Sequence, residues 1–118
     1  MKYKLYQVHI SRAESLRLQL GDSMPKYEAW IMANCDGNPF PALEGRYYAH
    51  VADIDASNLD EAFDVGNIGP EDQIVRHNEM HSVSVGDLMV DPENHCWMVD
   101  RDGFRSLDNV TINAGDSE

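Results

Sequence analysis

A chain of 118 residues, 42% hydrophobic and 25% charged, has the size and composition of one globular domain. Its 21 acidic and 9 basic residues give a net charge of −12, which disfavours direct contact with nucleic acid or an anionic membrane and favours basic protein surfaces. The chain has no signal-peptide pattern, no apolar run near the roughly 20 residues of a membrane span, and no C-x-x-C pair, so we expect a cytoplasmic protein with reduced thiols.

The first segment predicts a strand and a short helix. Residues Tyr3–Ile10 alternate between apolar and polar positions, as in a half-buried strand. Ser11 and Glu14 have the spacing of a capping box, which opens a helix that Gly21 ends.

A second helix and a second strand follow. Pro25 favours a helix start, and we expect a helix there, with a strand through Glu28–Ala33 as the alternative. The two prolines of Asp36–Pro41 predict a loop that extends to Gly45. Arg46–Asp55 then alternates as a strand, which places His50 and Asp53 on opposite faces.

Two further helices are predicted in the second half. Asn58 and Glu61 form another capping signal for a helix that ends near Gly66-Asn67. Gly69-Pro70-Glu71-Asp72 opens one more short helix, which Ile74 and Val75 would anchor in the core.

The last part of the chain predicts a β-hairpin. Two strands, Met80–Val90 and His95–Asp100, flank an Asp-Pro-Glu-Asn turn, and Leu88-Met89-Val90 is apolar enough to be covered on both faces. Phe104–Leu107 is expected to pair as a final short strand. The polar tail 109–118 should fray, with Val110 and Ile112 as its anchors. The order of elements predicts an α+β fold, in which a small, mostly antiparallel sheet with a C-terminal β-hairpin packs against three to four short helices.

Metal and nucleophile patterns are weak. His77 and His81 are four residues apart, but Glu does not directly follow the first His as in zinc metalloproteases. An EF-hand that starts at Asp53 would place Asn58 where the loop requires Gly. His95 and Cys96 are strand neighbours and therefore point to opposite faces. We expect no metal, no cofactor and no catalytic residues.

An acidic stretch is the strongest chemical feature. From Tyr47 to Val75 the chain holds seven acids and no Lys or Arg. Carboxylates on one helical face lie about 5–6 Å apart, which imitates the roughly 3.4 Å spacing of phosphates along a DNA strand. The predicted partner-binding acids are Asp53, Asp55, Asp60, Glu61, Asp64, Glu71 and Asp72.

The hairpin carries a family resemblance. His81-Ser82-Val83-Ser84-Val85-Gly86-Asp87 and Val99-Asp100-Arg101-Asp102-Gly103-Phe104 resemble the His-Ser-x-Ser-Val-x-Asp and Val-Asp-x-x-Gly-Phe motifs of YodL-like small domains. The resemblance covers residues 47–107. It implies an accessory protein of a phage, plasmid or integrative element, and it supplies no catalytic residues. Within the motif we expect structural roles: His81 and Ser82 hydrogen-bond the hairpin entrance, Gly86 bends it and Asp87 closes a local turn.

Two functions remain open at this point. The first is a non-catalytic acidic accessory protein that binds a basic partner and inhibits a host nucleic-acid-handling or defence enzyme in the manner of a DNA mimic. The second is a small enzyme or ligand-binding domain with a pocket lined by His50, His81, Asp87 and Trp97.

Overall fold

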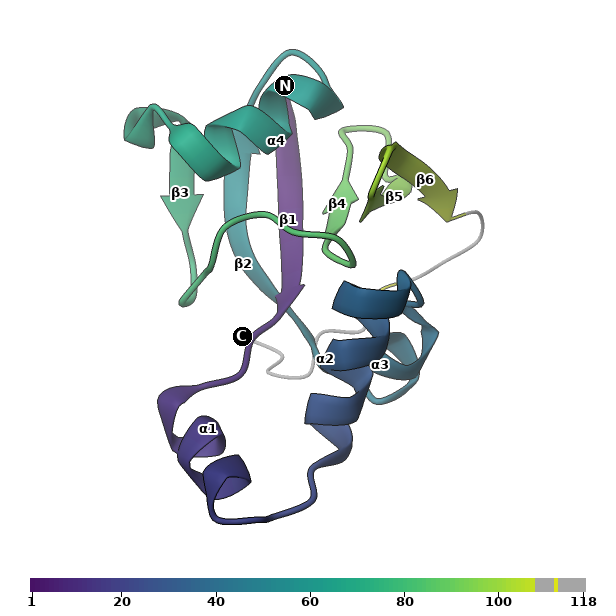
Figure 1. Ribbon diagram of the computed structural model, residues 1–118. Helices are drawn as coiled ribbons and strands as arrows, with labels where there is room; N and C mark the ends of the chain where they lie inside the picture. Colours follow the sequence, from purple (N-terminus) through teal and green to yellow (C-terminus); the bar gives the residue numbers. More distant parts are fainter. Residues whose placement is uncertain (108–111, 113–118) are drawn as a thin grey trace.

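The protein is an α+β fold built on one six-stranded antiparallel sheet. The computed structural model describes residues 1–107 and 112. The strands follow the order β3-β2-β1-β4-β5-β6, so that β1 and β4 occupy the centre (Figure 1). Their bounds are β1 Lys2–Val8, β2 Tyr48–Asp55, β3 Ile74–Arg76, β4 Leu88–Val90, β5 Cys96–Asp100 and β6 Gly103–Leu107.

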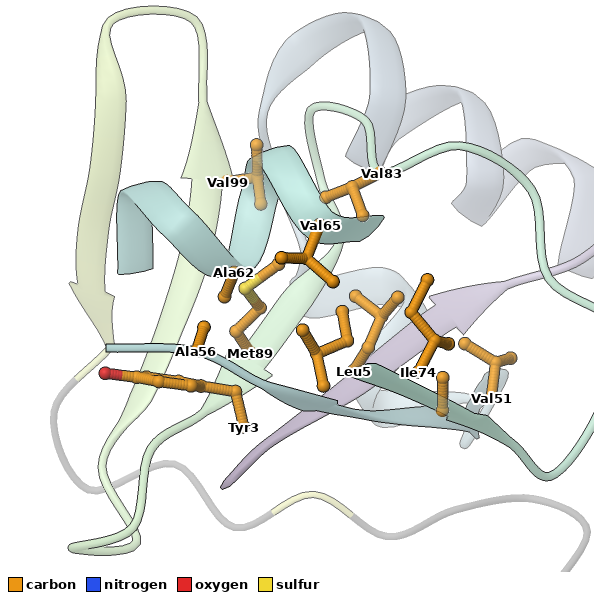
Figure 2. Packing of buried hydrophobic residues seen from close by; sticks show 12 residues of the cluster. Tyr3, Leu5, Val51, Ala56, Ala62, Val65, Ile74, Val83, Met89 and Val99 are labelled. Carbon is orange, nitrogen blue, oxygen red and sulfur yellow. The ribbon is translucent and has the colours of Figure 1, made fainter. Parts of the chain in front are cut away.

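Helices cover both faces of this sheet. The α-helices are α1 Arg12–Gln19, α2 Pro25–Asp36, α3 Phe40–Glu44 and α4 Leu59–Ile68, and a short 3₁₀ helix, η1, spans Glu71–Gln73. On one face α4 packs Ala62 and Val65 against Leu5 and Met89 (Figure 2), and Ile54 belongs to the same core. On the other face α2 and α3 contribute Ala29 and Ala42 to a second core. None of the described helices is long and apolar enough to cross a membrane.

Two capping signals and one proline in the sequence place the starts of three helices correctly. The Ser11 side chain and the Glu14 side chain form the expected capping box at α1, and the Asn58 side chain accepts a hydrogen bond from the Glu61 N–H at α4. Pro25 begins α2, so the helical interpretation is confirmed and the strand alternative for residues 28–33 is wrong. The α4 helix continues past Gly66 to Ile68.

Two predicted segments differ from the structure. The segment 36–45 was expected to be a loop, but it contains α3. Pro41 is compatible with this helix because it is the second helical residue, where a missing backbone N–H costs no helical hydrogen bond. The short helix predicted to open at Gly69-Pro70-Glu71-Asp72 is present as η1, but it ends at Gln73. Ile74 and Val75, expected to anchor that helix, form β3 instead, since their β-branched side chains suit the open edge of β2, with Ile74 opposite Ile54.

The hairpin is confirmed, but its first strand is shorter than expected. Residues Leu88–Val90 pair with β5 around the 91–95 turn, and β6 extends the sheet beyond β5. Leu88 and Met89 are fully buried on opposite faces, as predicted. Residues 80–87 are not a strand, because side chains accept hydrogen bonds from three of their backbone N–H groups, and the link to β5 is made near the end of the segment, where the Gly86 N–H donates to the Val99 carbonyl. The three bonds to side chains are His81 N–H to Gln7, Val83 N–H to Asn67 and Ser84 N–H to Asp87.

The two ends of the chain differ in how they pack. The α1 helix buries none of its residues and lies beyond the end of β1, away from the sheet (Figure 1). Ile112 packs against the second core, as predicted. Val110 and the expected fraying of the tail lie outside the described residues.

Candidate functional site

Two histidines and one carboxylate meet on the sheet face opposite α4. His50 Nε2 lies 2.8 Å from Asp53 Oδ1, and His77 Nε2 lies 3.0 Å from Asp53 Oδ2. One donor atom from each of the three residues lies within 4.8 Å of the others, and this is the only such group of three His, Cys, Asp or Glu residues that the described chain offers as a metal site. The side chains of His50 and Asp53 are 19% and 16% exposed, whereas His77 is 40% exposed. The cluster is therefore mostly buried at His50 and Asp53 and open to solvent at His77.

A β-bulge brings His50 and Asp53 to the same face. In a regular strand, residues three apart point to opposite faces. Here Tyr6 pairs with His50 while Leu5 pairs with Ala52, so Val51 is an extra residue without a partner on β1. Bulges of this kind redirect side chains and are common next to functional sites. The sequence prediction that His50 and Asp53 face apart is wrong for this reason.

Hydrogen bonds after β3 hold His77 over the cluster. The backbone N–H groups of His77 and Asn78 both donate to the Val51 carbonyl, and Asn78 Nδ2 donates to the His50 carbonyl. The His77 ring lies 4.7 Å from the His50 ring, and Tyr6 stacks on His50 at 5.1 Å. The residues on both sides of the bulge thus position all three donors.

The charge state of Asp53 follows from this arrangement. Partial burial, the largest single influence, raises the pKa of the Asp53 carboxyl, but the hydrogen bonds from His77 and His50 outweigh it and hold that pKa below its ordinary value. Asp53 is therefore an ionised acceptor between two imidazoles at neutral pH. Two imidazole nitrogens and one carboxylate are a ligand set for a divalent transition metal.

The four residues of the predicted pocket do not come together. Asp87 is 2% exposed and lies in the interior, where Gln7 Nε2 and the Ser84 N–H both donate to its Oδ2. His50 lies in the cluster with Asp53, and Trp97 donates its indole N–H to Asp91. His81 lines a shallow polar hollow between α4 and the 80–82 segment that none of the other three residues lines.

The structural roles inferred for His81, Gly86 and Asp87 in the hairpin motif are confirmed. Gln7 binds both the N–H and the carbonyl of His81, and Gly86 takes a positive φ of 92° at the bend before β4. Asp87 closes the local turn by accepting from Ser84. Burial, followed by the nearby His9, lowers the pKa of His81.

The seven predicted acids divide between two surfaces. Ile54 packs beneath α4, so its neighbours Asp53 and Asp55 point to the other face of β2. Glu71 is bound to Arg76, and Asp55 accepts from the N-terminal ammonium. The remaining acids are exposed on the outer side of α4 and on η1: Asp60, Glu61, Asp64 and Asp72.

A hollow lies beside the α4 acids that the sequence did not reveal. It has a volume of about 360 Å³ and lies between α4 and the β5–β6 hairpin. Phe63 and Phe104, packed edge to face, and Val99 form its apolar floor. Asp60 and Asp64 stand at its rim, and neither pairs with a cation among residues 1–107 and 112. Arg101 also lines the hollow, but its guanidinium donates to the Cys35 carbonyl at the end of α2.

Comparisons with known proteins do not identify the chain. It matches no protein-family model, no curated protein and no solved structure. The likeness to YodL-like domains therefore stays a prediction from the sequence of residues 47–107.

Proposed function

We propose that this protein is a non-catalytic acidic accessory protein that binds a basic partner protein through the outer face of α4. The observation that carries the proposal is the hollow between α4 and the β5–β6 hairpin, where an apolar floor lies directly beside carboxylates that pair with no cation in the described part of the chain. An apolar side chain flanked by Arg or Lys matches both parts of this surface. The apolar group would fill the hollow over Phe63 and Phe104, and the cations would meet Asp60 and Asp64.

The class of partner follows from charge. A net charge of −12 attracts basic surfaces at long range, and basic surfaces are typical of enzymes that handle nucleic acid. We propose such an enzyme as the partner and competition with its nucleic acid as the consequence. The hairpin resemblance favours a phage, plasmid or integrative element as the setting.

The test is binding of a labelled peptide in which Arg alternates with Leu, followed at increasing salt. We expect affinity to fall steeply between about 50 and 200 mM salt, because screening weakens exposed charge pairs. D60K/E61K/D64K should abolish binding. The matched control E28K/D36K/E44K reverses three exposed acids on α2 and α3, gives the same net charge of −6 (each reversal adds two to −12), and should bind within about threefold of the wild type.

A second variant separates binding from folding. Asp60 and Glu61 lie in the first turn of α4, where acids stabilise the helix dipole by about 0.3–1 kcal/mol each. D60N/E61Q/D64N removes the charges with a smaller effect on the helix, and it should also lose binding. The outer face of α4 would be ruled out as the binding site by either of two results. One is peptide binding that does not depend on salt, and the other is an equal loss of binding in D60K/E61K/D64K and E28K/D36K/E44K.

A further inference from the structure

We propose that His50, Asp53 and His77 form a binding site for a divalent transition-metal ion of the zinc type. The site is independent of the proposed function, because it lies on the other face of the sheet from the α4 acids. His50 and Asp53 are three residues apart on β2, and His77 lies 24 residues after Asp53. The β2 bulge and the turn after β3 bring the three side chains to one point.

The spacing of the donors suits a metal ion. Zinc binds imidazole nitrogen and carboxylate oxygen at about 2.0–2.2 Å, so neighbouring ligand atoms in a tetrahedral site lie about 3.3 Å apart. Asp53 lies 2.8 and 3.0 Å from the two Nε2 atoms, and all three donors fall within 4.8 Å. Small rotations of the side chains are enough to exchange the two hydrogen bonds for bonds to an ion.

The donor types select the metal. Ca²⁺ and Mg²⁺ take oxygen ligands, whereas imidazole nitrogens favour zinc and its first-row neighbours. Three protein ligands leave one position open, as in sites where the metal keeps a water molecule or binds a further ligand. The 40% exposure of His77 gives solvent access to that position.

The surrounding contacts hold the ligands before any ion arrives. Asn78 fixes the backbone at His50, the Val51 carbonyl fixes the backbone at His77, and Tyr6 stacks on the His50 ring. A site held in this way loses less conformational freedom on binding than three mobile surface side chains would. A comparison within the molecule is the His9–Glu79 pair, with the same 2.8 Å contact but only two donors.

The experiment is titration of the tag-free full chain with ZnCl₂ by calorimetry, and with CoCl₂ by visible absorption. We expect one ion per chain, a d–d absorption typical of four or five ligands, and no competition from millimolar MgCl₂ or CaCl₂. H77A and D53N should each weaken zinc binding by at least about 100-fold, because each removes a direct ligand. H9A and E79Q, which alter the two-donor pair, should leave zinc affinity within about threefold of the wild type.

Thermal unfolding distinguishes a lost ligand from a lost fold. Zinc should raise the melting temperature of the wild type, H9A and E79Q but not that of H77A, whose own fold is expected to persist because the side chain is the most exposed of the three. Absence of stoichiometric zinc binding to the wild type, or zinc binding by H77A and D53N as tight as that of the wild type, would overturn the proposal. Peptide binding at the α4 surface, measured in EDTA, should be the same for H77A and wild type, so the two proposals fail separately.

Discussion

At the scale of single residues, Asp87 has an unusual position for a carboxyl group. It lies at the end of the 80–87 segment and is buried against β1, where the Gln7 side chain and the Ser84 N–H donate to it. Burial raises the pKa of Asp87 to about 8 and outweighs these two hydrogen bonds, which act in the opposite direction. The folded protein thus holds this proton far more tightly than the unfolded chain, whose Asp pKa is about 3.9.

This difference predicts that stability falls as pH rises. The contribution of Asp87 is fully present below the unfolded pKa of about 3.9 and declines by about 1.4 kcal/mol per pH unit until the folded pKa near 8. D87N stays neutral and keeps an acceptor oxygen. Urea unfolding at pH 5, 6.5 and 8 should therefore show that the free energy of unfolding of the wild type falls relative to that of D87N as the pH rises. Parallel profiles would mean that Asp87 is already ionised at pH 5.

The sequence predicted the residues of the hairpin motif better than those of the metal site. His-Ser-x-Ser-Val-x-Asp is a local pattern, so the turn that Asp87 closes lies within a few residues of it. His50 and Asp53 depend on a bulge whose only trace is the pairing register with β1. A strict two-residue alternation puts them on opposite faces, and a single extra residue reverses that result. The contribution of His77 depends on β3, which was predicted as part of a helix.

At the scale of elements, the close approach of α2 to the bend before β4 depends on one glycine. Gly86 has a φ of 92°, and a Cβ added there would lie 2.4 Å from the Ala33 carbonyl oxygen. Tyr48 also donates its hydroxyl to the Gly86 carbonyl. The backbone of α2 at Ala33 and the backbone of the bend at Gly86 are therefore in close contact, with no side chain from Gly86 between them.

Gly86→Ala should destabilise the protein far more than backbone strain alone explains. Gly21 has nearly the same φ, 94°, with nothing within 4 Å of an added Cβ, so Gly21→Ala measures the strain by itself, about 1–2 kcal/mol. Gly86→Ala should cost about 1–3 kcal/mol more, because α2 must move away. Chemical denaturation of both variants measures the difference. Equal losses would show that the contact with Ala33 relaxes freely.

Elements with a cap or a strong period were predictable, and short elements set by neighbours were not. Ser11 and Asn58 begin α1 and α4 as their side chains dictate. The five residues of α3 and the three of β3 are too short for a periodic signal. Their conformations follow from the second core and from the free edge of β2, which only the assembled sheet provides.

At the scale of the whole molecule, β1 links the two cores. Leu5 is fully buried under α4, and Val8 is buried against the α2–α3 side. The same strand pairs with β2 on one edge and with β4 on the other. The sequence predicted β1 as a strand but not its central place, because pairing between distant strands leaves no local pattern.

Leu5→Ala should therefore destabilise both faces together. A fully buried Leu→Ala change costs about 2–5 kcal/mol, whereas Val75→Ala, at a 56% exposed position on the edge strand, should cost under about 0.5 kcal/mol. Far-UV circular dichroism and the fluorescence of Trp30, which packs against the second core, should report one shared transition in a W97F background. A Trp30 transition that Leu5→Ala leaves unshifted would show that the two cores unfold separately.

The central place of β1 also has a consequence for synthesis on the ribosome. This strand is the first of the described elements to be made. Its second edge can pair only after β4 has been made, because Tyr6 pairs with Leu88. At the about 5–20 residues per second of translation, the delay is roughly 4–16 s. An unpaired strand edge attracts other chains during such a delay, and charged residues reduce that attraction. Lys2 and Lys4, both exposed, place that charge on the waiting strand.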